Sequence, residues 1–422
     1  MKRTIAITLC LLWGLTLAAQ EESGFGIKFS GFVKNDFFID SRQTVAARNG
    51  HFLLWPSPVL LDPNGSDINA QPTFNILAIQ SRLKGTITGP DAFGARTSGV
   101  IEGDFFAQAN DNINLFRLRH AYTSLRWEHI EVLGGQTWNP LFVTSCFPGT
   151  VSFNTGTPLQ SFARNPQVRL SVFAGNWSFI IAALSQLDYS NWGVDGQTCK
   201  YIRDSATPDM HLQAHYSSSG ETGPGGVDIG GGISYKTIVP RLSSVMGPDP
   251  EDVYKVEEIV AGFTAMGYSQ ITTTPVTVKL QARYGENISD LLSISGFAVR
   301  EVTVPTSGER LYTPLRNMTF WGEFHTNGTG FQMGLFGGYL SNLGTREAMS
   351  DPGNPVYGLG TNIRYLYRIS PRVLFNSGKT RLALEVEYTV AGYGEEFDEN
   401  YIPGRVNAAE NLRGLAAIYY FF

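Results

Sequence analysis

Charged side chains spaced two residues apart are the groups in this sequence best placed to act on a solute. In an extended strand, residues two apart point to the same side; Glu102 and Asp104 form one such pair, and Arg117 and Arg119 another. Several such strands around a common lumen would create a field that selects among charged solutes. The expected lumen set is Lys28, Lys34, Arg82, Lys84, Glu102, Asp104, Arg117, Arg119, Arg169, Lys279 and Arg283.

The basic excess of this set has two interpretations. It could form a functional ladder that attracts anions, or the charges could keep a wide pore wet and pair with one another. Some pairing is expected, because Glu102 and Asp104 lie between two basic segments. The whole sequence has a net charge of −5, so the remaining acids are expected mainly in loops, such as residues 395–399.

The segments that carry these charges alternate with a period of two, which predicts β-strands. Many run for 10 to 14 residues, longer than the roughly 5–6 of globular strands and close to the roughly 9–11 of tilted membrane strands. Sixteen are predicted, at 25–38, 73–88, 96–107, 114–127, 130–138, 166–174, 177–186, 209–218, 226–238, 256–269, 275–285, 316–326, 329–341, 357–369, 379–391 and 413–422.

The connections between these strands alternate between long and short. Long ones include 39–72, 139–165 and 286–315, whereas Gly175-Asn176 and Asn327-Gly328 are short; the short segment 108–113 breaks the pattern. Such alternation is typical of up-and-down outer-membrane barrels. We therefore predict an all-β, antiparallel transmembrane β-barrel of about 16 strands, with 18 as the alternative.

Composition and the N-terminus agree with an exported barrel. Charged residues make up 16% of the sequence, against roughly 25% in soluble proteins, and no run of 18 apolar residues follows the N-terminus. Lys2 and Arg3 precede an apolar run and small residues, which predicts a signal peptide at 1–20 and a barrel at 21–422. Without those two, 32 basic residues become 30 against 37 acidic ones, so nucleic acid is not expected as a partner.

Aromatic side chains are expected at both edges of the membrane. The last strand ends at Phe422 with apolar residues two apart, so Phe422 is expected to be recognised by the outer-membrane assembly machinery; the alternative is an ordinary final strand. Trp127, Trp177, Trp192 and Trp321 are expected in interfacial belts, whereas Trp138 is left unassigned.

Several stretches resemble the DcaP-like porins, particularly their Bacteroidota-type branch. They cover mainly the first third of the mature chain and are Gly31–Phe38, Asp91–Gly99, Ile101–Phe106, Phe116–Tyr122, Gly134–Pro140, Cys146–Asn154 and Ser161–Pro166. The resemblance implies a 16-stranded homotrimeric porin that favours small anionic solutes. Outer-membrane lipid and lipopolysaccharide would surround it.

In porins of this size the connection after the fifth strand narrows the pore, which makes 139–165 the candidate constriction loop. It contains no Asp or Glu between Pro140 and Asn165, and its one charge is Arg164. An acid-free loop opposite a basic wall predicts anion preference. Its aromatic residues could line an apolar constriction or pin the loop to the wall; they include Phe142, Phe147, Phe153 and Phe162.

Other chemistry is weakly supported. Cys146 and Cys199 could form a disulfide between two loops. His211 and His215 would lie about 13 Å apart on one strand face, too far to share a metal, and His120 is expected to face the membrane interface. No catalytic motif stands out, so we expect no enzyme, cofactor or metal.

The leading hypothesis is passive diffusion of small hydrophilic, preferably anionic, solutes through an outer-membrane pore. One alternative is a structural or adhesive surface barrel that conducts nothing. The other is a hydrolase with its site at the barrel rim, which would require Ser, Asp or His side chains to converge there.

Overall fold

The computed structural model describes residues 24–218, 225–247, 249 and 251–422. The expected signal peptide at 1–20 lies outside this part of the chain. Within it, the α-helical structure is the short α1 (Lys200–Asp204), and 3-10 turns occur at Ile68–Ala70, Asn110–Asn112 and Ser289–Leu291. No helix among the described residues is both long and apolar enough to cross a membrane.

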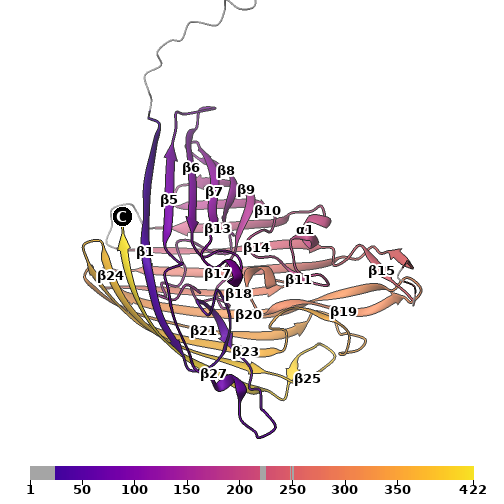
Figure 1. The fold of residues 1–422 in the computed structure, drawn as a ribbon. Helices are drawn as coiled ribbons and strands as arrows, with labels where there is room; N and C mark the ends of the chain where they lie inside the picture. Colours follow the sequence, from indigo (N-terminus) through magenta and orange to yellow (C-terminus); the bar gives the residue numbers. More distant parts are fainter. Residues whose placement is uncertain (1–23, 219–224, 248, 250) are drawn as a thin grey trace, which may run out of the picture.

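The main sheet closes on itself as an antiparallel barrel of sixteen crossings, which confirms the predicted fold class (Figure 1). β4 and β5 share one crossing, while β19 (Ser295–Val304) and β22 (Val356–Leu359) pair with each other on the external side. The crossings are β1 (Gly26–Asp40), β4 (Thr73–Leu77) with β5 (Arg82–Thr88), β6 (Arg96–Asp104), β7 (Arg117–Arg126), β8 (Ile130–Trp138), β9 (Arg164–Ala174), β10 (Trp177–Leu184), β13 (Asp209–Ser217), β14 (Gly226–Ile238), β17 (Val260–Thr272), β18 (Val276–Glu286), β20 (Glu309–Thr326), β21 (Phe331–Thr345), β23 (Ile363–Ser377), β24 (Thr380–Tyr393) and β27 (Asn407–Phe421).

The first and last strands close the barrel. β1 pairs with β27 from Phe32↔Phe421 to Asp40↔Arg413, and the Gly31 amide donates to the Phe422 carbonyl at 3.3 Å. In Figure 1 the indigo β1 lies beside the yellow β27. Closure pairs the two edges of the main sheet with each other, which is what a spanning sheet needs in lipid.

Turns and loops separate to opposite ends of the barrel. The short connections include Gly175-Asn176 between β9 and β10 and Gly378-Lys379 between β23 and β24; both glycines have positive φ, as tight hairpin turns favour. The long connections contain four small hairpins, formed by β2 (Thr44–Ala47) and β3 (Phe52–Pro56), β11 (Trp192–Gly193) and β12 (Gly196–Gln197), β15 (Ser243–Val245) and β16 (Val253–Lys255), and β25 (Glu396–Phe397) and β26 (Pro403–Gly404).

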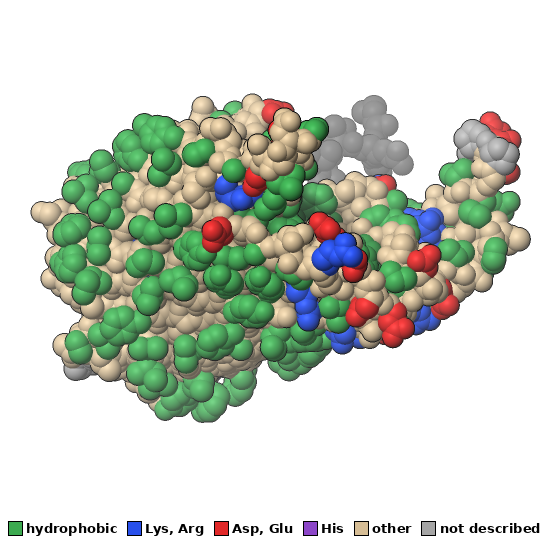
Figure 2. All heavy atoms as spheres, turned by 90° about the horizontal axis from the view of Figure 1, so that it is seen from below, with side chains coloured by type: hydrophobic (Ala, Val, Ile, Leu, Met, Phe, Trp, Pro, Cys, Tyr) green, Lys and Arg blue, Asp and Glu red, His purple; other side chains and the backbone are tan. Residues whose placement is uncertain are grey.

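Burial along the strands is inverted relative to a soluble protein. In β24, Leu384 is 52% exposed, whereas Glu385 and Glu387 are 2% and 0% exposed. The apolar set therefore faces outward and the charged set faces the lumen. Figure 2 shows apolar side chains spread over the barrel surface, while charged side chains gather on the projecting loops.

Some strand boundaries differ from the sequence prediction. The strand expected at 357–369 is β23 at Ile363–Ser377, because Val356–Leu359 forms the separate β22 and Gly360 turns the chain with φ +62°. Pro371 lies within β23, where its missing donor costs a ladder hydrogen bond. The final strand, expected at 413–422, begins earlier, at Asn407.

A β-bulge in β7 changes which side chains face the lumen. Glu102 pairs with His120 but Gly103 pairs with Leu118, so Arg119 is the extra residue. Arg119 and His120 are both buried as a result, at 1% and 6% exposure. The expectation that His120 faces the membrane interface is wrong, because a bulge shifts the alternation by one residue.

Candidate pore and its inner loop

The segment 139–163, which we call the inner loop, crosses the lumen. It leaves the barrel at β8, the fifth crossing, and returns at β9. Its contacts lie on β18, β20, β23 and β24 and on β1. In a closed barrel of sixteen crossings, the wall opposite the fifth is formed by these late strands, so the loop spans the interior.

Backbone donors of the inner loop bind carboxylates on the far wall. Glu385 accepts the amides of Val151 at 2.7 Å and Ser152 at 3.1 Å. Glu323 accepts the amide of Gly149, and Glu387 accepts the Asn154 side-chain amide at 2.9 Å. A loop without acids of its own can lie against these buried carboxylates without like-charge repulsion, and its donors satisfy them.

Carbonyls and a hydroxyl of the same loop bind basic side chains of the wall. Lys34 Nζ donates to the Val151 carbonyl at 2.8 Å and Lys279 Nζ to the Phe147 carbonyl at 2.9 Å. Arg283 donates to Ser161 Oγ at 2.6 Å. Three of the predicted lumen cations therefore contact the loop and hold it in place.

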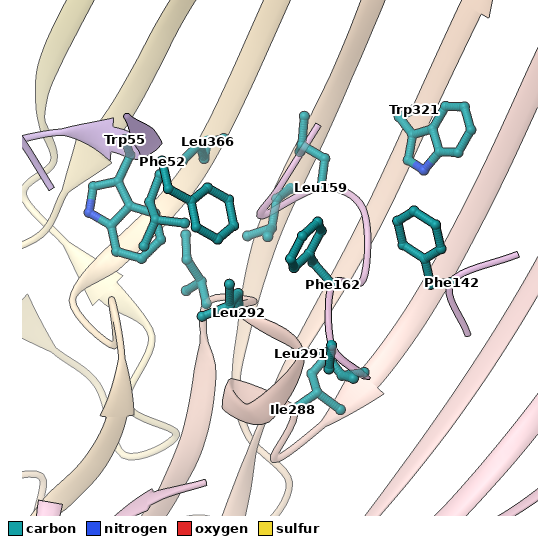
Figure 3. Close-up of a cluster of buried hydrophobic side chains, with 14 of the residues drawn as sticks. Phe52, Trp55, Phe142, Leu159, Phe162, Ile288, Leu291, Leu292, Trp321 and Leu366 are labelled. Atoms are coloured by element: carbon teal, nitrogen blue, oxygen red, sulfur yellow. The ribbon is translucent and has the colours of Figure 1, made fainter. Parts of the chain in front are cut away.

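An aromatic cluster packs the inner loop against neighbouring segments (Figure 3). Phe153 stacks on Phe106 with ring centroids 4.0 Å apart and meets the edge of Phe52, while Phe162 packs against Phe52 at 5.2 Å. Phe52 belongs to the β2–β3 hairpin, so the loop 41–72 also folds inward. The buried Phe153 and Phe162 fit the pinning interpretation rather than a pore lining.

The beginning of the inner loop carries a second aromatic contact. Phe142 stacks on Trp138 at 3.9 Å with their planes 12° apart, and Phe147 tilts against Phe142 at 5.3 Å. Arg164, at the start of β9, is fully buried and forms an ion pair with Asp188 beside the Trp138 ring. The expected charge of the constriction loop is thus neutralised within the wall.

Trp321 is a correction to the interfacial-belt expectation. Its side chain is fully buried, and its Nε1 donates to the side-chain oxygens of Gln160 and Gln281, both at 2.9 Å. The ring therefore faces the inner loop, because it shares the inward face of β20 with Glu323.

Much of the predicted basic ladder is an ion-pair network. Asp104 binds Arg117 at 2.8 Å and Arg119 at 2.9 Å, and Glu102 binds Arg119 at 2.8 Å and Arg82 at 3.4 Å. Asp104, Arg117 and Arg119 are nearly inaccessible to solvent. Their charges mainly neutralise one another, as the pairing interpretation expected.

This network yields a stability prediction. Asp104→Asn removes the carboxylate that two buried arginines share, and breaking such a pair costs about 3–5 kcal/mol of unfolding free energy. Urea titration of the barrel, followed by its heat-dependent electrophoretic mobility, measures the change. Glu257→Gln, in the exposed pair with Lys255, is the matched control and leaves stability unchanged; equal midpoints for the two variants would contradict the assignment.

Between the inner loop and the early strands lies a cavity of about 630 Å³. Lys84 and Arg169 line it, and among the described residues neither has a carboxylate within ion-pair distance. Glu102, paired with Arg82 and Arg119, and Asp228 are its acidic lining residues. Among the described residues, Lys84 and Arg169 therefore bring two cations without an ion-pair partner to this cavity, against one unpaired carboxylate, that of Asp228.

The cavity also contains side chains that sequence reasoning missed. His120 lines it because of the bulge in β7, and His215 lines it from β13 with its Nδ1 2.9 Å from the Tyr268 hydroxyl. The sequence signal for His120 is its position directly after Arg117 and Arg119, which alternate. One extra residue in the strand at this point turns the His120 side chain inward. Lys28, by contrast, is exposed near the turn end of β1 and does not line this cavity.

The suggested disulfide does not form, since Cys146 and Cys199 are both free. Cys146 is buried with its Sγ 3.7 Å from the Ser269 carbonyl of β17, whereas Cys199 precedes α1 beside β9 and β10. The two thiols lie against different walls, so no bridge can join them.

The two cysteines should differ in reactivity. Burial raises the pKa of the Cys146 thiol to about 12, and the thiolate is the reactive form. N-ethylmaleimide should therefore modify the partly exposed Cys199 at neutral pH and leave Cys146 intact. Peptide mass spectrometry of the labelled, folded protein checks this, and rapid labelling of Cys146 would show that the inner loop detaches from β17.

Solved structures with the same architecture are outer-membrane channels and porins, whereas no protein-family model and no curated protein matches the sequence. The outer-membrane channel DcaP of Acinetobacter baumannii aligns at 16% identity over 96% of this chain and 99% of its own, with a TM-score of 0.67. An anion-selective porin from Comamonas acidovorans aligns at 10% identity over 94% of this chain and 100% of its own, with a TM-score of 0.53. A trimer form of OmpT from Vibrio cholerae aligns at 10% identity over 94% of this chain and 100% of its own, with a TM-score of 0.54.

These likenesses show a shared fold. The chain has the sixteen-crossing barrel of outer-membrane porins, and its apolar outer face fits the outer membrane as its location. The architecture implied by the resemblance to DcaP-like porins is thereby confirmed.

Proposed function

We propose that this protein is an outer-membrane porin through which small hydrophilic solutes diffuse, with a preference for anions. The observation that carries the proposal is the cavity wall, where Lys84 and Arg169 have no carboxylate within ion-pair distance among the described residues. The adjoining part of the inner loop, Pro140 to Ser145, contributes no charge. An anion in this space meets two unpaired cations and one unpaired carboxylate, that of Asp228, among the described lining residues, and so a net positive charge. The surrounding is confined and partly apolar, so the Coulomb attraction is stronger than in bulk water.

The pore in this proposal is eccentric. In it, the inner loop and the β2–β3 hairpin fill the side of the lumen next to the late strands, which is supported by the buried cluster that these segments share. The open path then runs along the inner faces of β5 to β10, β13 and β14, whose side chains line the cavity. Phe142 and Trp138 line this path, and Arg169 lies close by, with its guanidinium donating to the Trp138 carbonyl at 2.9 Å.

Swelling of liposomes that contain the purified protein tests the proposal. With an anion, a neutral sugar alcohol and a cation of similar size, such as gluconate, sorbitol and glucosamine, we expect swelling rates in that order. No swelling with any solute, or fastest swelling with the cation, would refute the proposal. The first of these results would favour a non-conducting surface barrel, which the tightly packed half of the lumen would suit.

Assembly is part of the same proposal. We infer a homotrimer, supported by the trimeric form of a protein with the same fold, and delivery by the barrel assembly machinery through the exposed Phe422 ring. Small anions and the surrounding outer-membrane lipid and lipopolysaccharide are the other expected partners.

A further inference from the structure

A groove outside the barrel has a chemistry distinct from that of the pore. It has a volume of about 620 Å³ and lies at the external ends of β8, β9 and β10, beneath α1. Its wall includes Val168 and Ala183, its upper rim Ile202 and Arg203, and Cys199 lies along it. Val168 is 63% exposed and pairs directly with Ala183, so both belong to the outward face.

The groove exists because small side chains interrupt a surface of larger ones. Gly135 and Ala183 fill little space, whereas Leu184 and Ile202 are buried beside them. The result is a mainly apolar groove on the outward face of the wall, beside the external ends of these strands. A hydrocarbon chain fits such a hollow, because burying its methylene groups contributes about 0.8 kcal/mol each.

Arg203 of α1 contributes a cation to the lining of this groove. The Arg203 side chain is 66% exposed, and its Nε donates to Asp204 at 3.2 Å, while its Nη groups have no hydrogen-bond partner among the described residues. An exposed pair of this kind contributes little, and a guanidinium binds phosphate oxygens in a forked geometry. The apolar groove suits an acyl chain, and the exposed Arg203 guanidinium suits a phosphate, so together they match a lipid whose headgroup carries phosphate.

We propose that this groove is a binding site for a phosphorylated acyl lipid of the outer leaflet, with one acyl chain along Val168 and Ala183 and its phosphate on Arg203. The site rests on the placement of the barrel in the outer membrane and not on conduction. The channel proposal therefore survives if the lipid site fails, and the reverse also holds.

Cys199 provides a built-in reporter, because an acyl chain in the groove would cover it while Cys146 stays inert. We would compare N-ethylmaleimide labelling of the full chain in lipid-free detergent, in vesicles of the phosphate-free lipid digalactosyldiacylglycerol with lipid A, and in the same vesicles with dephosphorylated lipid A. Labelling should be fast in detergent and several-fold slower with lipid A than with its dephosphorylated form. Equal labelling rates with the two lipids would overturn the proposal. Slow labelling in detergent would overturn it too, because a second copy of the chain would then be what covers Cys199.

Two variants separate the headgroup from the acyl chain. Arg203→Gln should remove the difference between the two lipids, whereas Arg405→Gln, which removes an exposed cation beside β26 in the connection from β24 to β27, should keep it. Ala183→Trp should fill the groove and abolish lipid A retention in native mass spectrometry even though Arg203 remains. Retention in that variant, with the barrel folded by its heat-dependent mobility, would show that the lipid binds elsewhere.

Discussion

Deleting residues 144–156 of the inner loop should raise the single-channel conductance several-fold and move the ion preference towards cations. The conductance rises because this part of the loop crosses the lumen to reach the late strands. The preference changes because Glu385, which makes no ion pair among the described residues, loses the Val151 and Ser152 amides that now bind it and becomes a carboxylate facing water. The other charges that the deletion uncovers remain paired, Glu323 with Arg372 and Lys279, Glu387 with Arg368, and Lys34 with Asp36. Planar-bilayer recording of single channels measures both effects.

The β15–β16 hairpin offers a matched control for this deletion. Removing 243–255 shortens the chain by the same length in a segment that projects beyond the barrel (Figure 1). It should leave conductance and selectivity unchanged. If the two deletions gave the same conductance, the inner loop would not limit the pore.

Lys84→Gln with Arg169→Gln should remove most of the anion preference. A unit charge about 7 Å from the path of an ion contributes about 0.6 kcal/mol in water, a factor of about three in relative permeability for each charge. Neither group is held by a carboxylate, so little structural change is expected, unlike at Asp104. The ratio of chloride to potassium permeability, from zero-current potentials in a salt gradient, reports the change.

The control for this pair removes equal charge from the loops. Lys255 and Arg405 are exposed, each beside an acid, on the β15–β16 hairpin and near β26. Lys255→Gln with Arg405→Gln should leave the permeability ratio as in the unaltered protein. Should it lower the ratio as much as the lumen pair does, net charge and not the cavity wall would set the selectivity.

The architecture followed from the sequence because membrane strands carry a simple rule. Leu382, Leu384 and Val386 alternate with Glu385 and Glu387, and a segment of this length with one apolar face can only be satisfied in a closed barrel. Turn and loop lengths added the order of the strands. All sixteen crossings were therefore predictable, most of them to within a few residues at each end, with larger differences at β20, β23 and β27.

The detailed site was less predictable, because pairing and burial depend on neighbours that alternation does not reveal. Arg119 and Arg283 face the lumen as predicted. Arg119, however, is paired with acids, and Arg283 is covered by the inner loop. The prediction for His120 was wrong because of a β-bulge. A bulge leaves the alternating sequence pattern intact but changes which residues face inward beyond it. The difference between a buried cation and an open one, such as Arg169, appears only once the loop is in place.

The zero-current potential of the unaltered protein in a planar bilayer, across a potassium chloride gradient, tests the central claim most directly. The uncompensated charge of Lys84 and Arg169 predicts open channels whose potential has the sign of chloride preference. A potential of the opposite sign, or a membrane that stays silent although folded protein has inserted, would contradict the account.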